Sequence, residues 1–414
     1  MPHKPLSAEP NTFITMHLRK WYALPIYLLL AAGACPTPTH AQTSVTLYGT
    51  VDAGFAYTKH SSTPNDRFDA ETSFGMVSGG QSGNRFGLKG VEDIGAGQAF
   101  KFQLENGFNI GNGVAGQSQR LFGRQSWLGY ENRNAGRLLF GRQNNFASDY
   151  TGPLSPFTGQ YANASLGLSF GTANAERLSN LLKVETADLR GFKFGVGYSF
   201  ATGMTSGYAQ DGKIVELDRD TRDYNFVTVN NLRSFTSGVK YTDGPVYLTF
   251  TYDSFYPDAA TAKNDYKNAN AWILGGAYDF KVMKLSGAVG QTKNGAVNTL
   301  QNVLGIFRND TFDNTNSSII FDNSLAITST MVALSSPATS AGQFFFAWQM
   351  AKPSSNMQSS STYPISTQRV VSAGYSYPIT KKTSLYSYAG YAMNACLVEG
   401  LTSAVIAVGM THKF

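Results

Sequence analysis

The amino-acid sequence predicts an all-β protein, a transmembrane antiparallel β-barrel. Apolar and polar residues alternate with period two along much of the chain, which is typical of strands with one apolar face. The polar face carries Gly, Ser, Thr and Asn, and few of the Lys and Glu residues that would cover a soluble sandwich, the alternative fold. Long polar connections alternate with short turns, as at the two ends of a membrane barrel.

The composition indicates a folded chain with no nucleic-acid partner. Of the 414 residues, 42% are hydrophobic and 14% are charged, against roughly 25% charged in ordinary soluble domains. The 28 Phe and 22 Tyr exclude a disordered chain. The net charge of +6 is a mild excess and falls short of the basic stripe that nucleic-acid binding requires.

The N-terminal segment has the order of a secretory signal peptide. Arg19 and Lys20 precede an apolar run at 21–34, which is too short to span a membrane, and small residues follow. We expect cleavage after residue 41, so that 1–41 is the signal peptide and 42–414 is the barrel. A membrane anchor and a lipoprotein signal are the alternatives.

The segment at 191–200 shows the alternation most clearly. Phe192, Phe194 and Val196 fall on one face, and Lys193 falls on the other. Counting similar segments of about ten residues gives about fourteen to sixteen strands. Further segments with the same alternation lie at 45–57, 100–105, 246–253, 283–290 and 406–414.

One long connection differs from the others. The segment at 143–178 is polar, yet it carries Pro153, Phe157 and Tyr161. Loops of this length are usually functional or disordered, and the aromatic residues indicate a loop that packs. We therefore expect it to fold into the lumen. The other long loops are expected at 59–72, 202–232, 294–318 and 352–367.

The sequence offers no catalytic or metal-binding set. After residue 41 it holds two histidines, His60 and His412, neither in a recognisable nucleophile turn, and one cysteine, Cys396. The glycine-rich run at 79–83 lacks the Lys-Ser or Lys-Thr of a phosphate loop, and we interpret it as a strand bulge. The Asn and Asp residues at 309–316 depart from the spacing of calcium loops. We therefore expect no enzyme activity, metal or cofactor.

The alternation of side chains along each strand predicts which charged residues line the lumen. Phe86 and Leu88 are expected to face lipid, so Arg85 and Lys89 point inward. A lipid-facing cation near the bilayer midplane would cost about 2–4 kcal/mol, which supports this assignment. The same parity nominates Lys101, Glu105, Lys193, Asp253 and Lys284.

Several segments resemble the general porins of β-proteobacterial outer membranes. The resemblance is tight over 44–155 and at the C-terminus, whereas 204–232 and 294–366 depart from the family pattern. It implies a homotrimer of 16-stranded barrels, each with a water-filled channel narrowed by an inward-folded third loop. The segments are SVTLYGTVDAGFAY at 44–57, GNRFGLKGVEDIGAGQAFKFQLENGFN at 83–109, LFGRQSWLGY at 121–130, LLFGRQ at 138–143, YSYPITKKTSLYSYAGY at 375–391 and AVGMTHKF at 407–414.

The same resemblance implies roles for individual residues. It places a basic cluster on the wall at Arg85, Arg124 and Arg177, with Asp149 of the third loop opposite them. It makes Phe414 the terminal aromatic residue that the barrel-assembly machinery reads. The implied surroundings and partners are outer-membrane lipid, lipopolysaccharide and small hydrophilic solutes.

These features predict passive diffusion of small hydrophilic solutes and ions through an outer-membrane channel. A weak preference for anions is expected, because close-set arginines attract anions and repel cations. A substrate-specific channel is the alternative of the same shape. A non-conducting structural barrel or adhesin is the alternative from another class. A barrel enzyme is the third alternative, and the absence of a plausible catalytic histidine in this sequence counts against it.

Overall fold

The computed structural model describes residues 43–61, 70–157, 160–173, 176–210, 213–217, 231–297, 318–356 and 364–414. These residues belong to one compact unit, Ala41–Phe414. The expected signal peptide at 1–41 lies outside the described residues, as does most of the expected loop at 294–318.

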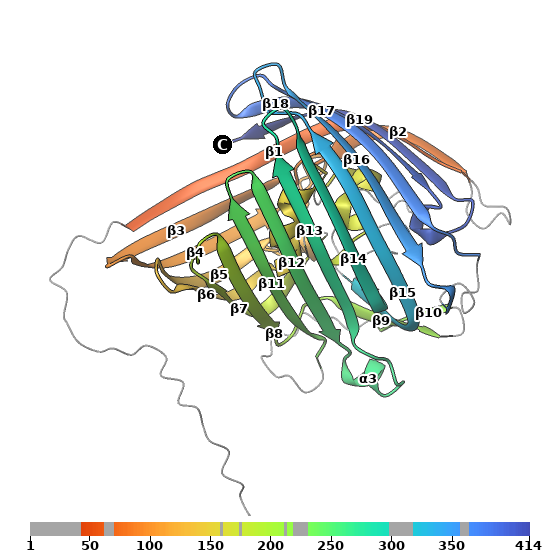
Figure 1. Ribbon diagram of the computed structural model, residues 1–414, viewed down its shortest axis with the longest axis horizontal. Coiled ribbons are helices and arrows are strands. Elements are labelled where there is room, and N and C mark those ends of the chain that lie inside the picture. The colour runs from red at the N-terminus through yellow and green to blue at the C-terminus, as the bar shows by residue number, and fades with distance from the viewer. Residues whose placement is uncertain are drawn as a thin grey trace, which may run out of the picture. The chain divides into compact units, whose positions relative to one another are not determined.

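One sheet contains the 19 strands of the described residues (Figure 1). In chain order they are β1 Thr43–His60, β2 Glu71–Ser78, β3 Arg85–Gly95, β4 Gln98–Gly107, β5 Gln125–Asn132, β6 Gly136–Asn144, β7 Arg177–Thr186, β8 Phe192–Ser199, β9 Thr205–Gln210, β10 Lys213–Leu217, β11 Arg233–Asp243, β12 Val246–Tyr256, β13 Ala269–Asp279, β14 Lys284–Val297, β15 Ser318–Ser335, β16 Gln343–Pro353, β17 Gln368–Pro378, β18 Thr383–Met393 and β19 Thr402–Lys413.

The sheet closes on itself and forms a barrel of 16 strands. Strand β1 closes it by pairing with β19 and with both β2 and β3. β2 and β3 pair with successive parts of β1 and so form one interrupted strand. β9 and β10 form a hairpin in the connection between β8 and β11. With that hairpin set apart and β2 counted with β3, the 19 strands give 16, which confirms the predicted antiparallel barrel.

The alternation of the sequence places apolar side chains on the outer face. On β8, Phe192, Phe194 and Val196 are 43%, 49% and 52% exposed. On β12, by contrast, the inward Thr251 and Asp253 are fully buried. A continuous apolar exterior of this kind is favourable against lipid hydrocarbon and unfavourable in water. The chain therefore builds a membrane barrel whose polar residues face inward.

The two ends of the barrel differ in their connections. At one end, short turns join β3 to β4, β5 to β6 and the later hairpins. In the first of these, Gly95 and Gly97 have φ of 86° and 74°, which glycine adopts without strain. The loops predicted at 59–72, 202–232, 294–318 and 352–367 include residues that lie outside the described ones. The other end carries the long connections, among them those between β4 and β5, between β6 and β7 and between β12 and β13. The one between β6 and β7, residues 145–176, is the third and is called the third loop below.

Helical residues occur only in the long connections between strands, within the part of the chain that the structure describes. None of these helices is long and apolar enough to cross a membrane, among the residues described. They are α1 Gly116–Gln119, α2 Phe146–Thr151 and α3 Ala259–Ala262, with the 3₁₀ turns η1 Gly152–Leu154, η2 Ala162–Ala164, η3 Leu166–Leu168, η4 Gly171–Ala173 and η5 Ala395–Leu397.

Candidate functional site

The third loop lies inside the ring of strands, against one part of its wall (Figure 1). Its helix α2 contacts β11 and β12, and η1 contacts β13 and β14. Further along, η2 contacts β17, β18 and β19. We call the inner face of β8, where Gly195 meets the ring of Phe146, and of β11 to β19 the covered wall. The inner face of β3 to β6, with the first residues of β7, is called the uncovered wall.

Apolar side chains hold the loop on the covered wall. Leu154, Phe157 and Leu166 of the loop are at most 1% exposed. They form one buried cluster with small and apolar residues of the wall. Burial of each such side chain contributes about 1.5–3 kcal/mol. The wall residues of this cluster include Ala277, Ala288, Ala333, Ala347 and Ala407.

Glycines of the barrel strands make room for the loop. A Cβ atom at Gly195 would lie 2.2 Å from the ring of Phe146. A Cβ atom at Gly275 would lie 2.3 Å from a methyl carbon of Leu154. Both distances are shorter than van der Waals contact, so only glycine lets the loop approach this closely.

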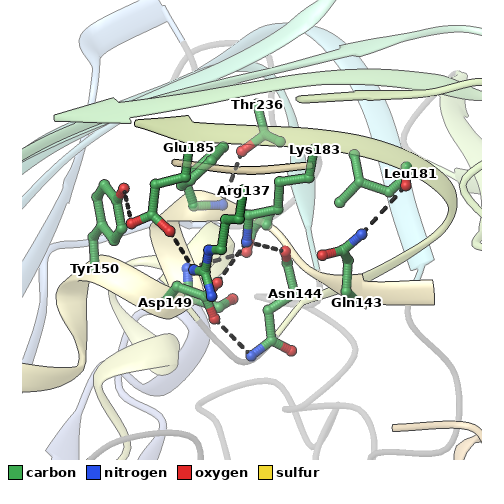
Figure 2. A network of polar contacts seen from close by, with 12 residues as sticks. Arg137, Gln143, Asn144, Asp149, Tyr150, Leu181, Lys183, Glu185 and Thr236 are labelled. Atoms are coloured by element: carbon green, nitrogen blue, oxygen red, sulfur yellow. Dashed lines mark hydrogen bonds and ion pairs between the residues drawn. The ribbon is translucent and has the colours of Figure 1, made fainter. Parts of the chain in front are cut away.

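An ion pair between a buried lysine and a half-buried aspartate fixes helix α2 to strand β7 (Figure 2). Lys183 Nζ lies 2.5 Å from Asp149 Oδ2 and donates to the carbonyl of Asn144 at 3.0 Å. The Asn144 side chain donates to Asp149 Oδ1 at 3.0 Å. The Lys183 side chain is only 2% exposed, and its Nζ lies 4.3 Å from the ring centroid of Phe146. The loop acid therefore pairs with a cation that the sequence analysis did not nominate.

Glu185 provides a second attachment for the same helix (Figure 2). The hydroxyl of Tyr150 donates to Glu185 Oε1 at 2.8 Å. Arg137 forms an ion pair with Glu185, and Lys240 Nζ lies 3.4 Å from its Oε1. Burial and the Glu185 carboxylate raise the pKa of Tyr150. The tyrosine thus stays protonated and remains a donor.

The beginning of the loop is tied to the fully buried Asp253. Asn145 caps helix α2 by accepting from Ser148 N at 3.0 Å, and its amide donates to Asp253 Oδ1 at 3.0 Å. Lys284, nominated by parity like Asp253, donates to the carbonyl of Pro153 at 2.6 Å. Both nominated residues therefore hold the third loop.

Two arginines and one carboxylate stand on the uncovered wall. Arg124 Nε lies 2.6 Å from Glu105 Oε1, and Arg85 Nε lies 3.8 Å from Glu105 Oε2. Tyr48 donates to Glu105 Oε2 at 2.9 Å and accepts from Gln103 at 2.6 Å. One carboxylate thus faces two guanidinium groups, which leaves a local excess of positive charge.

Two further arginines adjoin this pair. Arg142 donates to the carbonyls of Gly123 and Arg177, at 2.7 and 3.1 Å. Arg177 lies near Arg124 and Arg142, which repel it, and near Glu105 and Glu176, which attract it. Together with Arg85, these residues form what we call the arginine group: Arg85, Arg124, Arg142 and Arg177.

The other nominated charges lie away from the arginine group. Lys89 is exposed, with Nζ 5.4 Å from the ring centroid of Tyr48. Lys101 pairs with Glu131 at 2.7 Å. Both lysines stand nearer to the short turns than the arginine group does. Lys193 is the pairing partner of Lys240 on β11.

Sequence reasoning missed Arg142, Lys183 and Glu185. Lys183 and Glu185 flank the lipid-facing Val184, which is 43% exposed, so strand parity was an available signal for them. Arg142 had no such signal, because the register of β6 against β7 shifts around it.

Phe414 lies where the barrel closes. Its backbone exchanges two hydrogen bonds of 3.2 Å with Gly49 of β1. A Cβ atom on Gly49 would lie 2.2 Å from the Phe414 ring, which is itself 46% exposed on the outer face. Recognition of this residue by an assembly machinery stays a prediction.

A closed barrel with an apolar exterior, a charged lumen and an internal loop defines the class of outer-membrane channels. The profile of the Gram-negative porin family matches residues 28–395, and the chain belongs to this family. The protein is therefore an outer-membrane porin, a channel and not an enzyme.

Relatives and solved structures agree with this assignment. An outer membrane porin protein of Bordetella pertussis is 36% identical over 384 residues, 90% of this chain and 95% of the relative. Outer membrane porin protein 32 of Delftia acidovorans is 29% identical over 276 residues, 64% of this chain and 69% of the relative.

Among solved structures, an anion-selective porin from Comamonas acidovorans has a TM-score of 0.64 at 20% identity, covering 90% of this chain and all of that one. A trimer form of OmpT from Vibrio cholerae has a TM-score of 0.56 at 12% identity, covering 90% of this chain and 99% of that one. At these identities the two structures show the fold alone.

Proposed function

We propose that the protein mediates passive diffusion of small hydrophilic solutes and ions, with a weak preference for anions. The observation that carries the proposal is the arginine group, in which Arg85 and Arg124 share the single carboxylate of Glu105. A local excess of cations at the lumen wall raises the concentration of anions there. The preference is weak because other charges in the lumen are paired, as Lys183 is with Asp149.

The proposed selectivity rests on the charges of this chain. The solved porin described as anion-selective supports the fold, and at 20% identity it does not assign roles to residues of this chain. In the proposed arrangement, Arg85, Arg124, Arg177 and Asp149 line the narrow part of the channel, and Lys89 and Lys101 line its wider part. Arg142 is buried and donates to the carbonyls of Gly123 and Arg177.

We also propose that the protein works as a homotrimer surrounded by outer-membrane lipid and lipopolysaccharide. One solved structure of the same fold is described as a trimer form. Phe414, which follows the closing strand β19 and pairs with Gly49 of β1, is proposed to be the signal for the barrel-assembly machinery.

Single-channel recording in a planar bilayer under a salt gradient tests the proposal. We expect conductance steps in groups of three and a reversal potential on the anion side. Arg124→Gln should lower the anion preference. Arg133→Gln, which removes the same charge from an exposed turn, should leave it unchanged.

The same recording separates the alternatives. Conductance that saturates with one class of solute would favour a substrate-specific channel. Absence of pores from folded protein would overturn the proposal and favour the structural barrel or adhesin.

A further inference from the structure

The strand formed by β2 and β3 is interrupted by residues 79–84. Between the paired positions Ala53–Ser78 and Thr50–Arg85, β1 advances by three residues and its partner by seven. The surplus residues leave the ladder as a small loop, which we call the insert. This is the glycine-rich run that the sequence analysis interprets as a bulge.

Asp52 of β1 holds the insert in place. Its Oδ2 accepts from the backbone N–H groups of Gln81 and Ser82, at 3.2 and 2.8 Å. The side chain of Asn84 accepts from Asp52 N at 2.5 Å and donates to Asp52 O at 3.0 Å. Asp52 is fully buried, and a buried carboxylate is strongly unfavourable without such donors. The carboxylate of Asp52 therefore supplies two of the hydrogen bonds that hold the insert, and the backbone of the same residue supplies two more.

The same carboxylate connects the last two strands with the third loop. Tyr386 donates to Asp52 Oδ1 at 2.8 Å, and Thr411 donates to Oδ2 at 2.7 Å. The rings of Tyr386 and Tyr388 are stacked with centroids 6.2 Å apart. Tyr388 in turn meets Tyr161 of the third loop edge-on, at 5.2 Å. A row of aromatic side chains thus joins Asp52 to the loop.

The insert also touches the third loop and the arginine group directly. The backbone N–H of Tyr161 donates to the carbonyl of Gly80 at 3.1 Å. Arg85 donates from Nη1 to the carbonyl of Gly83 at 2.8 Å. A Cβ atom on Gly83 would lie 3.1 Å from Arg124 Nη1. Displacement of the insert would therefore move both sides of the proposed narrow part.

We propose that Asp52 is the positioning residue that sets the width of the channel, by holding the insert between the third loop and the arginine group. This inference rests on the proposed channel function and adds the residue that fixes its narrow part. Asp52 acts through the insert and through Tyr386, and solutes do not contact it, because its side chain is fully buried.

The test compares Asp52→Asn with Glu131→Gln. Each substitution removes one acidic group from the inward face, and Glu131 pairs with Lys101 near the short turns, away from the insert. In liposome-swelling assays, Asp52→Asn should admit large neutral sugars roughly twofold faster than the wild type, because pore width sets their passage. Glu131→Gln should match the wild type, so a change of charge alone does not explain the effect.

A second measurement does not depend on conduction. Deuterium exchange of third-loop peptides containing Tyr161 should be roughly tenfold faster in Asp52→Asn, because the loop opens more often without its support. Tyr386→Phe removes one hydrogen bond to Asp52 and keeps the ring, so deuterium exchange should be accelerated less than in Asp52→Asn. This variant provides the test if Asp52→Asn does not fold.

The outcomes are separable. Folded variants with wild-type exchange and wild-type swelling would overturn the role of Asp52 while leaving the channel proposal intact. A wild type without pores would overturn the channel proposal, and unchanged exchange in the variants would then overturn the positioning role on its own.

Discussion

The covered wall and the uncovered wall are built from the same alternating strands, yet their inward faces carry different chemistry. The covered wall presents alanines, glycines and residues such as Ile273 and Met331 to the third loop. The uncovered wall presents the arginine group and Glu105. The lumen of this porin is therefore not polar throughout. One side supplies a core for the loop, and the other supplies charge where we propose that solutes pass.

Removal of a large ring from the loop should have the largest effect. Phe157 is fully buried, and its ring meets Tyr161 and Phe345 edge-on at 5.2 and 5.9 Å. Phe157→Ala should loosen the loop from the covered wall at a cost of about 3–5 kcal/mol. We expect a lower midpoint of thermal unfolding and a higher single-channel conductance.

Phe346→Ala is the matched control for that substitution. Phe346 follows Phe345 in β16 but faces lipid and is 44% exposed. Its loss should lower the unfolding midpoint less and leave the conductance unchanged. Equal changes in conductance for the two variants would show that the covered wall does not hold the loop.

A methyl group added to the covered wall should have a smaller effect. Gly195→Ala places Cβ 2.2 Å from the ring of Phe146, and such overpacking costs about 1–3 kcal/mol. Gly287→Ala on β14 places Cβ 3.5 Å from its nearest neighbour, the carbonyl of Met331, and should be tolerated. Thermal unfolding of both variants in detergent measures the difference. A Gly195 variant as stable as the wild type would mean that helix α2 does not rest against β8.

Local patterns predict the strands and their lipid-facing sides, because side-chain parity along a strand is fixed by the backbone. They also predict an inward third loop, from aromatic residues such as Phe157 in a polar connection. They do not predict which part of the wall the loop covers. That depends on contacts between distant residues, such as the approach of Phe146 to Gly195 and of Phe157 to Gly374.

The charged site was partly predictable for the same reason. Arg85 and Glu105 follow from uninterrupted alternation, and Lys183 could have been found in this way. Arg142 could not, because the register shift in β6 reverses parity near it. Asp52 lies on the inward face by parity, but its partners come from an insert and from strands more than 300 residues away.

The smallest expected effect compares one charge on each wall. Glu105→Gln leaves Arg124 and Arg85 without their carboxylate and should raise the ratio of anion to cation permeability. Two unit charges at contact distance in water interact with about 1 kcal/mol, so the increase in the permeability ratio should not exceed about fivefold. Added salt should reduce this increase, because mobile ions screen exposed charges.

Asp253→Asn is the comparison on the covered wall. It removes an acidic group that is fully buried beneath the start of the third loop, and it should shift the reversal potential less than Glu105→Gln does. Equal shifts would mean that selectivity follows the total charge of the lumen, and the distinction between the two walls would then concern packing alone.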